Sequence, residues 1–278
     1  MSIAIVTDST ADIPPEYLAE YNIHVMPNII VIEGQEVEDG ESFSRQAFYE
    51  KLPFMKSFPT TSTASSGSYQ KLYESLLQKG YNQIISLHAS SLLSGIFNAA
   101  RTGAQAFEKY VHVIDSHQVS LGLGFQVLAA AQAVQRGWPV ESILNHIENV
   151  RRRVRLIAMF DTLEYVRRSG RVSWAKAGLG TILRIKPFVE VKEGIVRSLG
   201  EVRTRRKGIE RLVTMIRNLG NLEYLAVLHT NAEVDASQVL EALKAKVTGM
   251  SPMIVNVTTI IGAHVGPNGL GVAAVTQW

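Results

Sequence analysis

Cysteine is absent from this sequence of 278 residues. Its absence excludes disulfide bonds, thiolate nucleophiles and metal sites with cysteine ligands, and it places no demand on the redox compartment. The seven histidines show no H-E-x-x-H or comparable spacing, so we expect no metal site. No apolar run approaches the length that crosses a bilayer, and the chain opens on an apolar strand without the basic leader of a signal peptide. These absences predict a cytoplasmic protein.

Several catalytic signatures are also missing. The nucleophile elbow G-x-S-x-G of serine hydrolases occurs nowhere, and no P-loop, kinase glycine-rich loop or magnesium-binding aspartate cluster is visible. Gly122 and Gly124 begin a dinucleotide-type pattern, but Val127 stands at the position of its third glycine. Ser173 and Lys176 match S-x-x-K without the S-D-N and K-T-G partners of lactamases. We therefore predict no catalytic residue and no bound cofactor in this chain.

The composition that is present is ordinary for a soluble globular protein, with 46% hydrophobic and 19% charged residues. A chain of this length is long for one core, so we expect two domains, residues 1–153 and 154–278. The net charge is only +3, but basic residues form clusters that either meet anionic partners or form solvated helix faces. The clusters are Arg151, Arg152, Arg153 and Arg155, then Arg167, Arg168 and Arg171, then Arg203, Arg205, Arg206 and Lys207. No nucleic-acid-binding motif accompanies them, so we expect no nucleic-acid partner and at most transient contact with a membrane surface.

The order of strand-type and helix-type segments predicts the fold class, which is α/β in both halves. Up to residue 153 such segments alternate, which predicts a doubly wound parallel sheet of the α/β/α type. Within this half, residues 33–40 are predicted as a turn and residues 53–68 as a loop. In the second half, residues 188–191 and 195–199 flank a turn as a hairpin. Because a hairpin pairs its strands antiparallel, we predict a mixed sheet for the C-terminal domain.

The stretch 82–98 combines a predicted strand, a serine-rich turn and the start of a helix. In an open parallel sheet, ligands bind beyond the carboxyl ends of the strands, where the free backbone N–H groups of a starting helix attract anions. Ser90, Ser91 and Ser94 lie at this place and could hold a carboxylate or a phosphate, although serine is also a preferred helix N-cap. No general base is visible that would make any of them a nucleophile.

Four other residues are candidates for a functional role. Thr61 and Ser62 lie in the predicted loop and have no evident structural duty, and ordered loops of this kind often carry function. Asp8 ends the first strand, where we favour an Asx-type turn over a catalytic role. His264 stands among four glycines, which lets backbone and ligand approach closely, and a packed structural role is an equal alternative.

Five blocks of the sequence together resemble the DegV family. They are DSTADI at 8–13, TSTAS at 61–65, SSLLSGIFN at 90–98, LEYVRRSGRVS at 163–173 and HVGPNGLG at 264–271. The likeness spans the whole chain in order, and the joint pattern is more specific than any block alone. Members of this family are fatty-acid-binding proteins, and some serve as the binding subunit of bacterial fatty acid kinase.

The resemblance implies a two-domain α/β protein that encloses a long acyl chain in an apolar pocket and holds its carboxylate with hydroxyl groups near the domain junction. The implied ligand residues are Thr61, Ser62, Ser94 and His264, with Arg171 near the pocket mouth or at the surface that a partner contacts. The implied partners are a long-chain fatty acid and a separate ATP-dependent kinase that forms an acyl phosphate. The chain itself is then not an enzyme.

Two places depart from the pattern of that family. Leu92 replaces its usual glycine, which could reshape the turn beside the carboxylate, while Arg168 and Ser169 replace its usual Lys-Gly, which could alter partner docking. The residues alone also leave two other functions open. One is a stand-alone acyl hydrolase or transferase that uses Ser94 and His264, and the other is a nucleotide-binding regulatory protein.

Overall fold

The structure, a computed structural model, describes residues 2–40, 44–171 and 185–277. The chain forms two compact units. The first unit comprises residues 1–29, 62–152 and 193–195, and the second unit comprises residues 30–61, 153–192 and 196–278. The predicted domain boundary lies after residue 153, and the chain passes from the first unit to the second between residues 152 and 153. Two segments, however, group with the half of the chain to which they do not belong in sequence. Residues 30–61 belong to the second unit, and residues 193–195 belong to the first unit.

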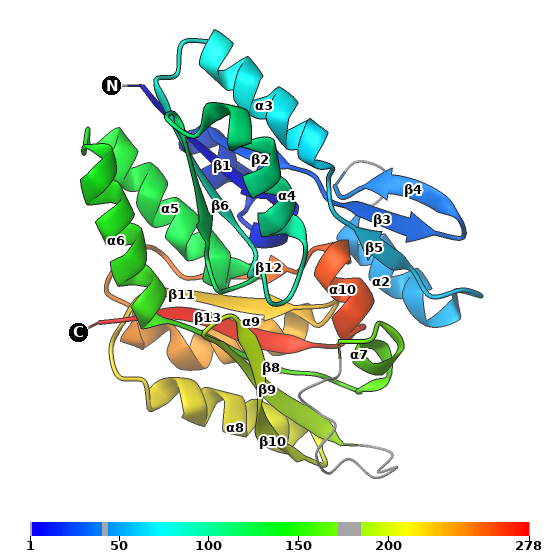
Figure 1. Cartoon of the computed structure of the whole chain (residues 1–278). Helices are drawn as coiled ribbons and strands as arrows, with labels where there is room; N and C mark the ends of the chain where they lie inside the picture. The colour runs from blue at the N-terminus through cyan, green and yellow to red at the C-terminus, as the bar shows by residue number, and fades with distance from the viewer. Residues whose placement is uncertain (1, 41–43, 172–184, 278) are drawn as a thin grey trace. The chain divides into compact units, whose positions relative to one another are not determined.

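The first unit is built on a four-stranded parallel sheet with the order β2-β1-β6-β7. Its strands are β1 (Ile3–Asp8), β2 (Ile23–Met26), β6 (Gln83–His88) and β7 (Val111–Asp115). Its helices are α1 (Pro15–Glu20), α3 (Ser66–Gln78), α4 (Ile96–Gly103), α5 (Leu121–Gln135) and α6 (Val140–Arg153), with the short 3-10 helices η1 (Ser9–Ala11) and η3 (Gln105–Phe107). In Figure 1, α3 and α4 cover one face of this sheet and α5 covers the other. The predicted doubly wound parallel sheet is confirmed.

The local sequence explains this arrangement. β1 is buried along its whole length, as expected of a strand that is covered on both faces. α5 is apolar all round and almost completely buried, which suits a helix in the interior of its unit. Because parallel strands end at the same edge of a sheet, the last residues of β1, β6 and β7 come to one edge: Asp8, His88 and Asp115.

The second unit contains a six-stranded mixed sheet with the order β10-β9-β8-β13-β11-β12. Its strands are β8 (Val154–Met159), β9 (Lys186–Lys192), β10 (Ile195–Val202), β11 (Leu222–His229), β12 (Met253–Asn256) and β13 (Leu270–Thr276). β8 pairs antiparallel with β9 and β13, β13 pairs antiparallel with β11, and β11 and β12 are parallel. The mixed sheet and the hairpin of β9 and β10, with the left-handed residues Glu193 and Gly194 at its turn, confirm the predictions.

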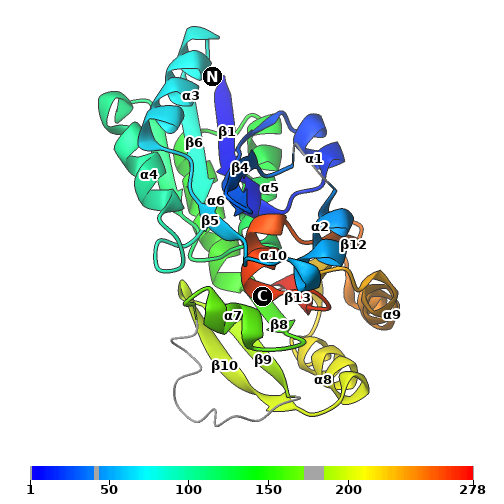
Figure 2. The same ribbon diagram turned by 90° about the vertical axis from the view of Figure 1, so that its right-hand side faces the viewer.

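Among the described residues, four helices complete the main body of the second unit. α8 (Arg205–Arg217) and α9 (Glu233–Leu243) pack on each other and lie side by side in Figure 2, and the 3-10 helix η5 (Lys244–Lys246) extends α9. Buried apolar residues of these helices, among them Leu212, Ile216 and Val239, form a core with the sheet. α7 (Glu164–Arg168) packs against α10 (Thr259–Val265).

A three-stranded sheet with the order β4-β3-β5 is carried almost entirely by residues 30–61. Its strands are β3 (Ile29–Ile32), β4 (Gln35–Glu38) and β5 (Thr60–Ser62), and α2 (Arg45–Lys51) with the 3-10 helix η2 (Leu52–Phe54) lies between β4 and β5 in the chain. This segment joins the second unit through one apolar cluster, which contains Ile30, Phe48, Tyr49, Leu52, Tyr165, Ile260 and Ala263. The burial of these side chains, which sequence order does not reveal, explains why the segment leaves the N-terminal half.

Two local predictions in this segment were wrong. The stretch 33–40, predicted as a turn, contains β4, and the predicted loop 53–68 contains the end of η2 and β5. Both strands are short and mostly polar, and β4 is largely exposed, so neither shows the alternation of apolar residues by which a strand is recognised.

Candidate functional site

Thr61 and His264, two of the predicted ligand residues, form a hydrogen-bonded pair in the second unit. Thr61 lies in β5, and His264 lies in the last turn of α10. The distance between the Thr61 Oγ1 and His264 Nε2 atoms is 3.0 Å. Both side chains are partly buried. The structure therefore brings together two residues that are 203 positions apart in the sequence.

The environment of His264 keeps its imidazole uncharged near neutral pH. Burial, which penalises the charged form, and then the positive charge of Arg171 lower the pKa of His264 from 6.5 to about 4. The Nδ1 atom of His264 is buried and has no hydrogen-bond partner within the described residues. A buried ring nitrogen without a partner is costly, so this atom marks a place where a polar group of a ligand would be stabilising.

The glycines around His264 make room for side chains of the protein itself. A Cβ atom on Gly262 would overlap the side chain of Tyr49, and a Cβ atom on Gly266 would overlap the ring of Tyr165. Gly266 also has a φ of 79°, which disfavours other residues. These glycines therefore let α10 pack closely on two tyrosines, and this packing holds His264 in place. The glycine pattern predicted the close approach of a ligand here, and the structure shows two tyrosine side chains against these glycines.

Arg171 follows α7 and is exposed. Its guanidinium donates a hydrogen bond to the carbonyl oxygen of Ser169 at 2.6 Å, and its charge acts on His264. Two neighbouring residues, Arg168 and Ser169, make local contacts. The Ser169 hydroxyl donates to the carbonyl oxygen of Val166 at 3.2 Å, and the Arg168 guanidinium stacks 4.0 Å from the centre of the Phe58 ring.

Ser62 and Ser94 belong to the first unit. Ser62 is exposed at the end of β5, and the unit boundary falls between it and its neighbour Thr61. Ser94 is partly buried, and its hydroxyl accepts a long hydrogen bond of 3.4 Å from the amide of Ile96, close to the start of α4. A Cβ atom on Gly95 would lie 3.8 Å from the methyl group of Thr63, so the segments that carry the two serines are neighbours.

The other two serines of the stretch 82–98 make structural contacts. Ser90 is fully buried, and its hydroxyl donates to the carbonyl oxygen of Gly194 at 2.8 Å. The backbone amide of Ser91 donates to the Asp115 carboxylate at 3.2 Å. The Ser90 hydroxyl is thus bonded within the protein, whereas the Ser94 hydroxyl has one long bond, near the start of α4, among the described residues.

A buried network at the end of β1 was missed by the sequence analysis. Asp8 accepts a hydrogen bond from the amide of Thr10 at 3.0 Å, which is the predicted Asx-type turn. Its other carboxylate oxygen lies 3.1 Å from Nδ1 of His88, and Nε2 of His88 lies 2.7 Å from the Ser86 hydroxyl. The Tyr73 hydroxyl lies 2.9 Å from Ser86. Ser86 and His88 are two residues apart in an apolar strand and therefore lie on the same face of it. This pair of polar residues is the sequence feature that could have indicated the network.

This network has the order serine, histidine, aspartate that hydrolases use, but Ser86, His88 and Asp8 are all 0% exposed. No substrate reaches a hydroxyl so deeply buried, so we assign the network a structural role. Burial alone would raise the pKa of Asp8, but the hydrogen bond and charge of His88 and the hydrogen bonds from Thr10 and Ala89 hold it below its usual value. Ser173 and Lys176, the S-x-x-K match, lie outside the described residues.

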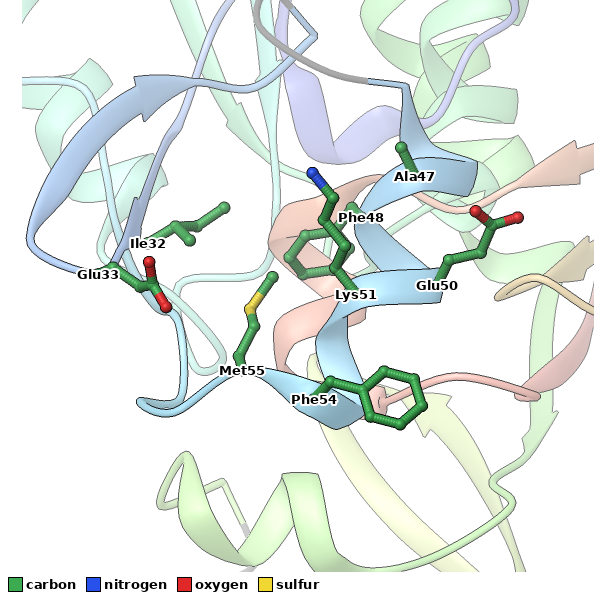
Figure 3. Close-up of a pocket in the computed structure, with 8 residues that line it drawn as sticks. All are labelled: Ile32, Glu33, Ala47, Phe48, Glu50, Lys51, Phe54 and Met55. Atoms are coloured by element: carbon green, nitrogen blue, oxygen red, sulfur yellow. The ribbon is translucent and has the colours of Figure 1, made fainter.

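An open pocket of about 460 Å³ lies within the second unit. Figure 3 shows Ile32, Phe48 and Met55 directed toward one another, while the Phe54 ring points away from them. Glu33, Ala47, Glu50 and Lys51 complete its lining. None of the predicted ligand residues lines this pocket.

The described ranges contain no group of three acidic or histidine side chains placed to hold a metal ion. Across the same residues, every helix is too short or too polar to span a lipid bilayer.

Comparison with known proteins gives a consistent result. A family model described as "uncharacterised protein, DegV family" matches residues 2–277. A DegV domain-containing protein of Deinococcus radiodurans is 35% identical over 276 residues, which are 98% of each chain. Among solved structures, a DegV family protein of Thermus thermophilus described for its fatty acid binding superposes with a TM-score of 0.92 at 30% identity. DegV of Bacillus subtilis, described as a fatty acid binding protein, superposes with a TM-score of 0.88 at 31% identity. Both superpositions cover 100% of each chain.

Proposed function

Because this chain belongs to the DegV family, we propose that it binds a long-chain fatty acid. The proposal is supported by the two similar solved structures, whose proteins are described as fatty acid binding. Within this chain, the observation that carries it is the pair of Thr61 and His264, in which a buried, uncharged imidazole keeps one nitrogen without a partner.

The chemistry of this pair suits a carboxylate. A neutral imidazole has one N–H group and one lone pair. When the proton is on Nε2, it donates to Thr61, whose own O–H is then available to the ligand. When the proton is on Nδ1, that N–H group is itself available. In both tautomers the pair of Thr61 and His264 offers one donor to an acceptor such as a carboxylate oxygen. Ser62 and Ser94 supply further neutral donors in the proposed site.

Neutral donors are sufficient because the acyl chain supplies most of the affinity. Burial of an alkyl chain gains about 0.8 kcal/mol per methylene, so about fifteen methylenes provide on the order of 12 kcal/mol before the costs of ordering. The head group then needs orientation more than strength. An arginine buried against the carboxylate would bind it tightly and occupy its oxygens. We place the exposed Arg171 at the pocket mouth or at a partner surface instead.

We further propose that the bound carboxylate is presented to a separate ATP-dependent kinase. In that reaction a carboxylate oxygen would attack the γ-phosphorus of ATP, the bond from this phosphorus to the leaving ADP oxygen would break, and an acyl phosphate would form. Two features support this division of labour: the sequence has no nucleotide-binding motif, and the proposed donors are uncharged. Cytoplasmic location is part of the same proposal.

Titration of delipidated protein with palmitate, 1-hexadecanol, ATP and NAD tests the proposed function. We expect saturable binding of palmitate, weaker binding of hexadecanol, and no binding of either nucleotide. ATP or NAD binding without palmitate binding would support a nucleotide-binding regulatory protein and contradict ours. Hydrolysis of an acyl ester by the chain alone, lost in Ser94→Ala while palmitate binding persists, would favour the hydrolase or transferase.

A further inference from the structure

The turn of the hairpin formed by β9 and β10 is built into the first unit. Residues 193–195 group with that unit, although most of the two flanking strands belongs to the sheet of the second unit. Two hydrogen bonds hold the turn at one residue. The Gly194 amide donates to the carbonyl oxygen of His117 at 3.1 Å, and the Gly194 carbonyl oxygen accepts from the Ser90 hydroxyl at 2.8 Å. The hairpin turn therefore contacts the serine-rich turn directly.

Ser90 fixes the backbone of the residues that follow it. Its carbonyl oxygen accepts hydrogen bonds from the amides of Leu93 and Ser94, each at 3.0 Å. Its hydroxyl oxygen accepts from the amide of Leu92 at 3.2 Å while it donates to Gly194. Since Ser90 is 0% exposed, no water replaces these partners if one is removed. A shift of Ser90 would therefore move the backbone that carries the Ser94 hydroxyl.

The loop after β7 anchors both sides of this contact. The two carboxylate oxygens of Asp115 accept from the amides of Ser91, at 3.2 Å, and His117, at 2.9 Å. The amide of Ser90 donates to the carbonyl oxygen of Gln118 at 2.9 Å. The serine-rich turn, the loop after β7 and the hairpin turn thus form a closed set of hydrogen bonds, and the hairpin turn is the part that comes from the other half of the chain.

The approach of the hairpin turn requires glycine at residue 194. Gly194 has a φ of 81°, and a Cβ atom there would lie 2.8 Å from the Ser90 hydroxyl oxygen and 3.3 Å from a methyl group of Leu92. Any larger residue is strained and also displaces Ser90. Leu92, which departs from the family pattern, is 66% exposed and lies beside the turn, so it leaves the contact of Ser90 and Gly194 intact.

We propose that this hairpin turn positions Ser94 for the carboxylate, with Ser90 and Gly194 as positioning residues that do not touch the ligand. The proposal rests on the proposed function, in which Ser94 donates to the fatty acid head group. A neutral hydroxyl forms a good hydrogen bond only within a narrow range of distance and angle. A backbone held by Ser90 keeps the hydroxyl in that range before the ligand arrives, which lowers the cost of binding.

The test compares palmitate with 1-hexadecanol, which has the same chain length and no carboxylate. We expect Ser90→Ala to lower the ratio of their affinities about tenfold, because a displaced Ser94 loses most of a hydrogen bond to a charged group. Gly194→Ala should lower the same ratio. In the double variant this ratio should be no lower than in the more affected single variant, since both changes break the same contact between Ser90 and Gly194.

Ser86→Ala is the matched control. Ser86 is also a fully buried serine with two side-chain hydrogen bonds, but these bonds go to Tyr73 and His88. It should lower the melting temperature and leave the affinity ratio unchanged. If Ser90→Ala lowers the affinities for palmitate and 1-hexadecanol equally, or lowers neither, it behaves like Ser86→Ala and the positioning role is overturned. If the unaltered protein does not bind palmitate at all, the proposed function fails instead, so the two failures are distinguishable.

Discussion

Replacing Thr61 by valine isolates the contribution of one hydroxyl to the proposed site. Valine keeps the branched shape of threonine, so the change mainly removes the hydrogen bond of 3.0 Å to His264. The imidazole is then left with neither ring nitrogen bonded by a described partner, since Nδ1 already has none. A lost hydrogen bond of this kind costs about 1 kcal/mol of folding free energy, so the variant should remain folded.

The effect on ligand affinity should be larger. When the His264 proton is on Nε2, Thr61 donates to the carboxylate. A hydrogen bond to a charged group is worth about 1.5–3 kcal/mol, so its loss should lower palmitate affinity about tenfold to more than a hundredfold. Titration calorimetry of palmitate into delipidated protein measures this decrease, and urea unfolding checks that the variant is folded. Thr61→Ser is the matched control, because it keeps the hydroxyl and should bind palmitate nearly as well as the unaltered protein. Unchanged palmitate affinity in a folded Thr61→Val variant would refute a direct hydrogen bond from Thr61 to the carboxylate.

Three further predictions concern stability. Because the pKa of His264 is lowered from 6.5 to about 4 in the folded protein, the unfolded chain binds a proton between these pH values that the folded chain does not. The free energy of unfolding should therefore decrease as the pH falls from 6.5 to about 4, and it should decrease less in His264→Gln. Equal pH dependence of the two proteins in urea unfolding would contradict this. Asp8→Ala should lower the free energy of unfolding by about 3–5 kcal/mol in chemical denaturation, because it leaves His88 without its buried carboxylate. In the unaltered protein, the lowered pKa of Asp8 stabilises the fold above pH 3.8, the ordinary pKa of this group. This stabilisation is lost as the pH falls from 3.8 through the lower pKa of the folded state. Gly266→Ala should lower the melting temperature more than Gly220→Ala, because both have positive φ but only Gly266 faces a tyrosine ring; equal losses would rule out the tyrosine contact as the cause.

The fold was predictable from the sequence where hydrophobic patterning is strong. β1, β6 and β7 are apolar runs separated by helices, and the hairpin of β9 and β10 has a turn signal at Glu193 and Gly194. The polar strands β4 and β5 carry no such signal. The placement of residues 30–61 in the second unit depends on which apolar side chains meet in space, and local sequence does not contain that information.

The sequence, partly through the family resemblance, nominated the residues of the candidate site, but it could not predict their geometry. Thr61 and His264 were each nominated, yet only the structure pairs them. Ser90 and Ser94 looked equivalent in sequence, and the difference between them comes from Gly194, more than a hundred positions away, which engages one and not the other. The roles of Thr61, Ser62, Ser94, Arg171 and His264 in ligand binding all stay predictions.

A native mass spectrum most directly tests the central claim that this protein binds one fatty acid. The spectrum is recorded for protein as purified and again after delipidation and addition of palmitate. We predict a species heavier than the bare chain by the mass of one fatty acid in at least the second spectrum, and its loss when the complex is denatured. A spectrum that shows only the bare chain under both conditions would contradict the account.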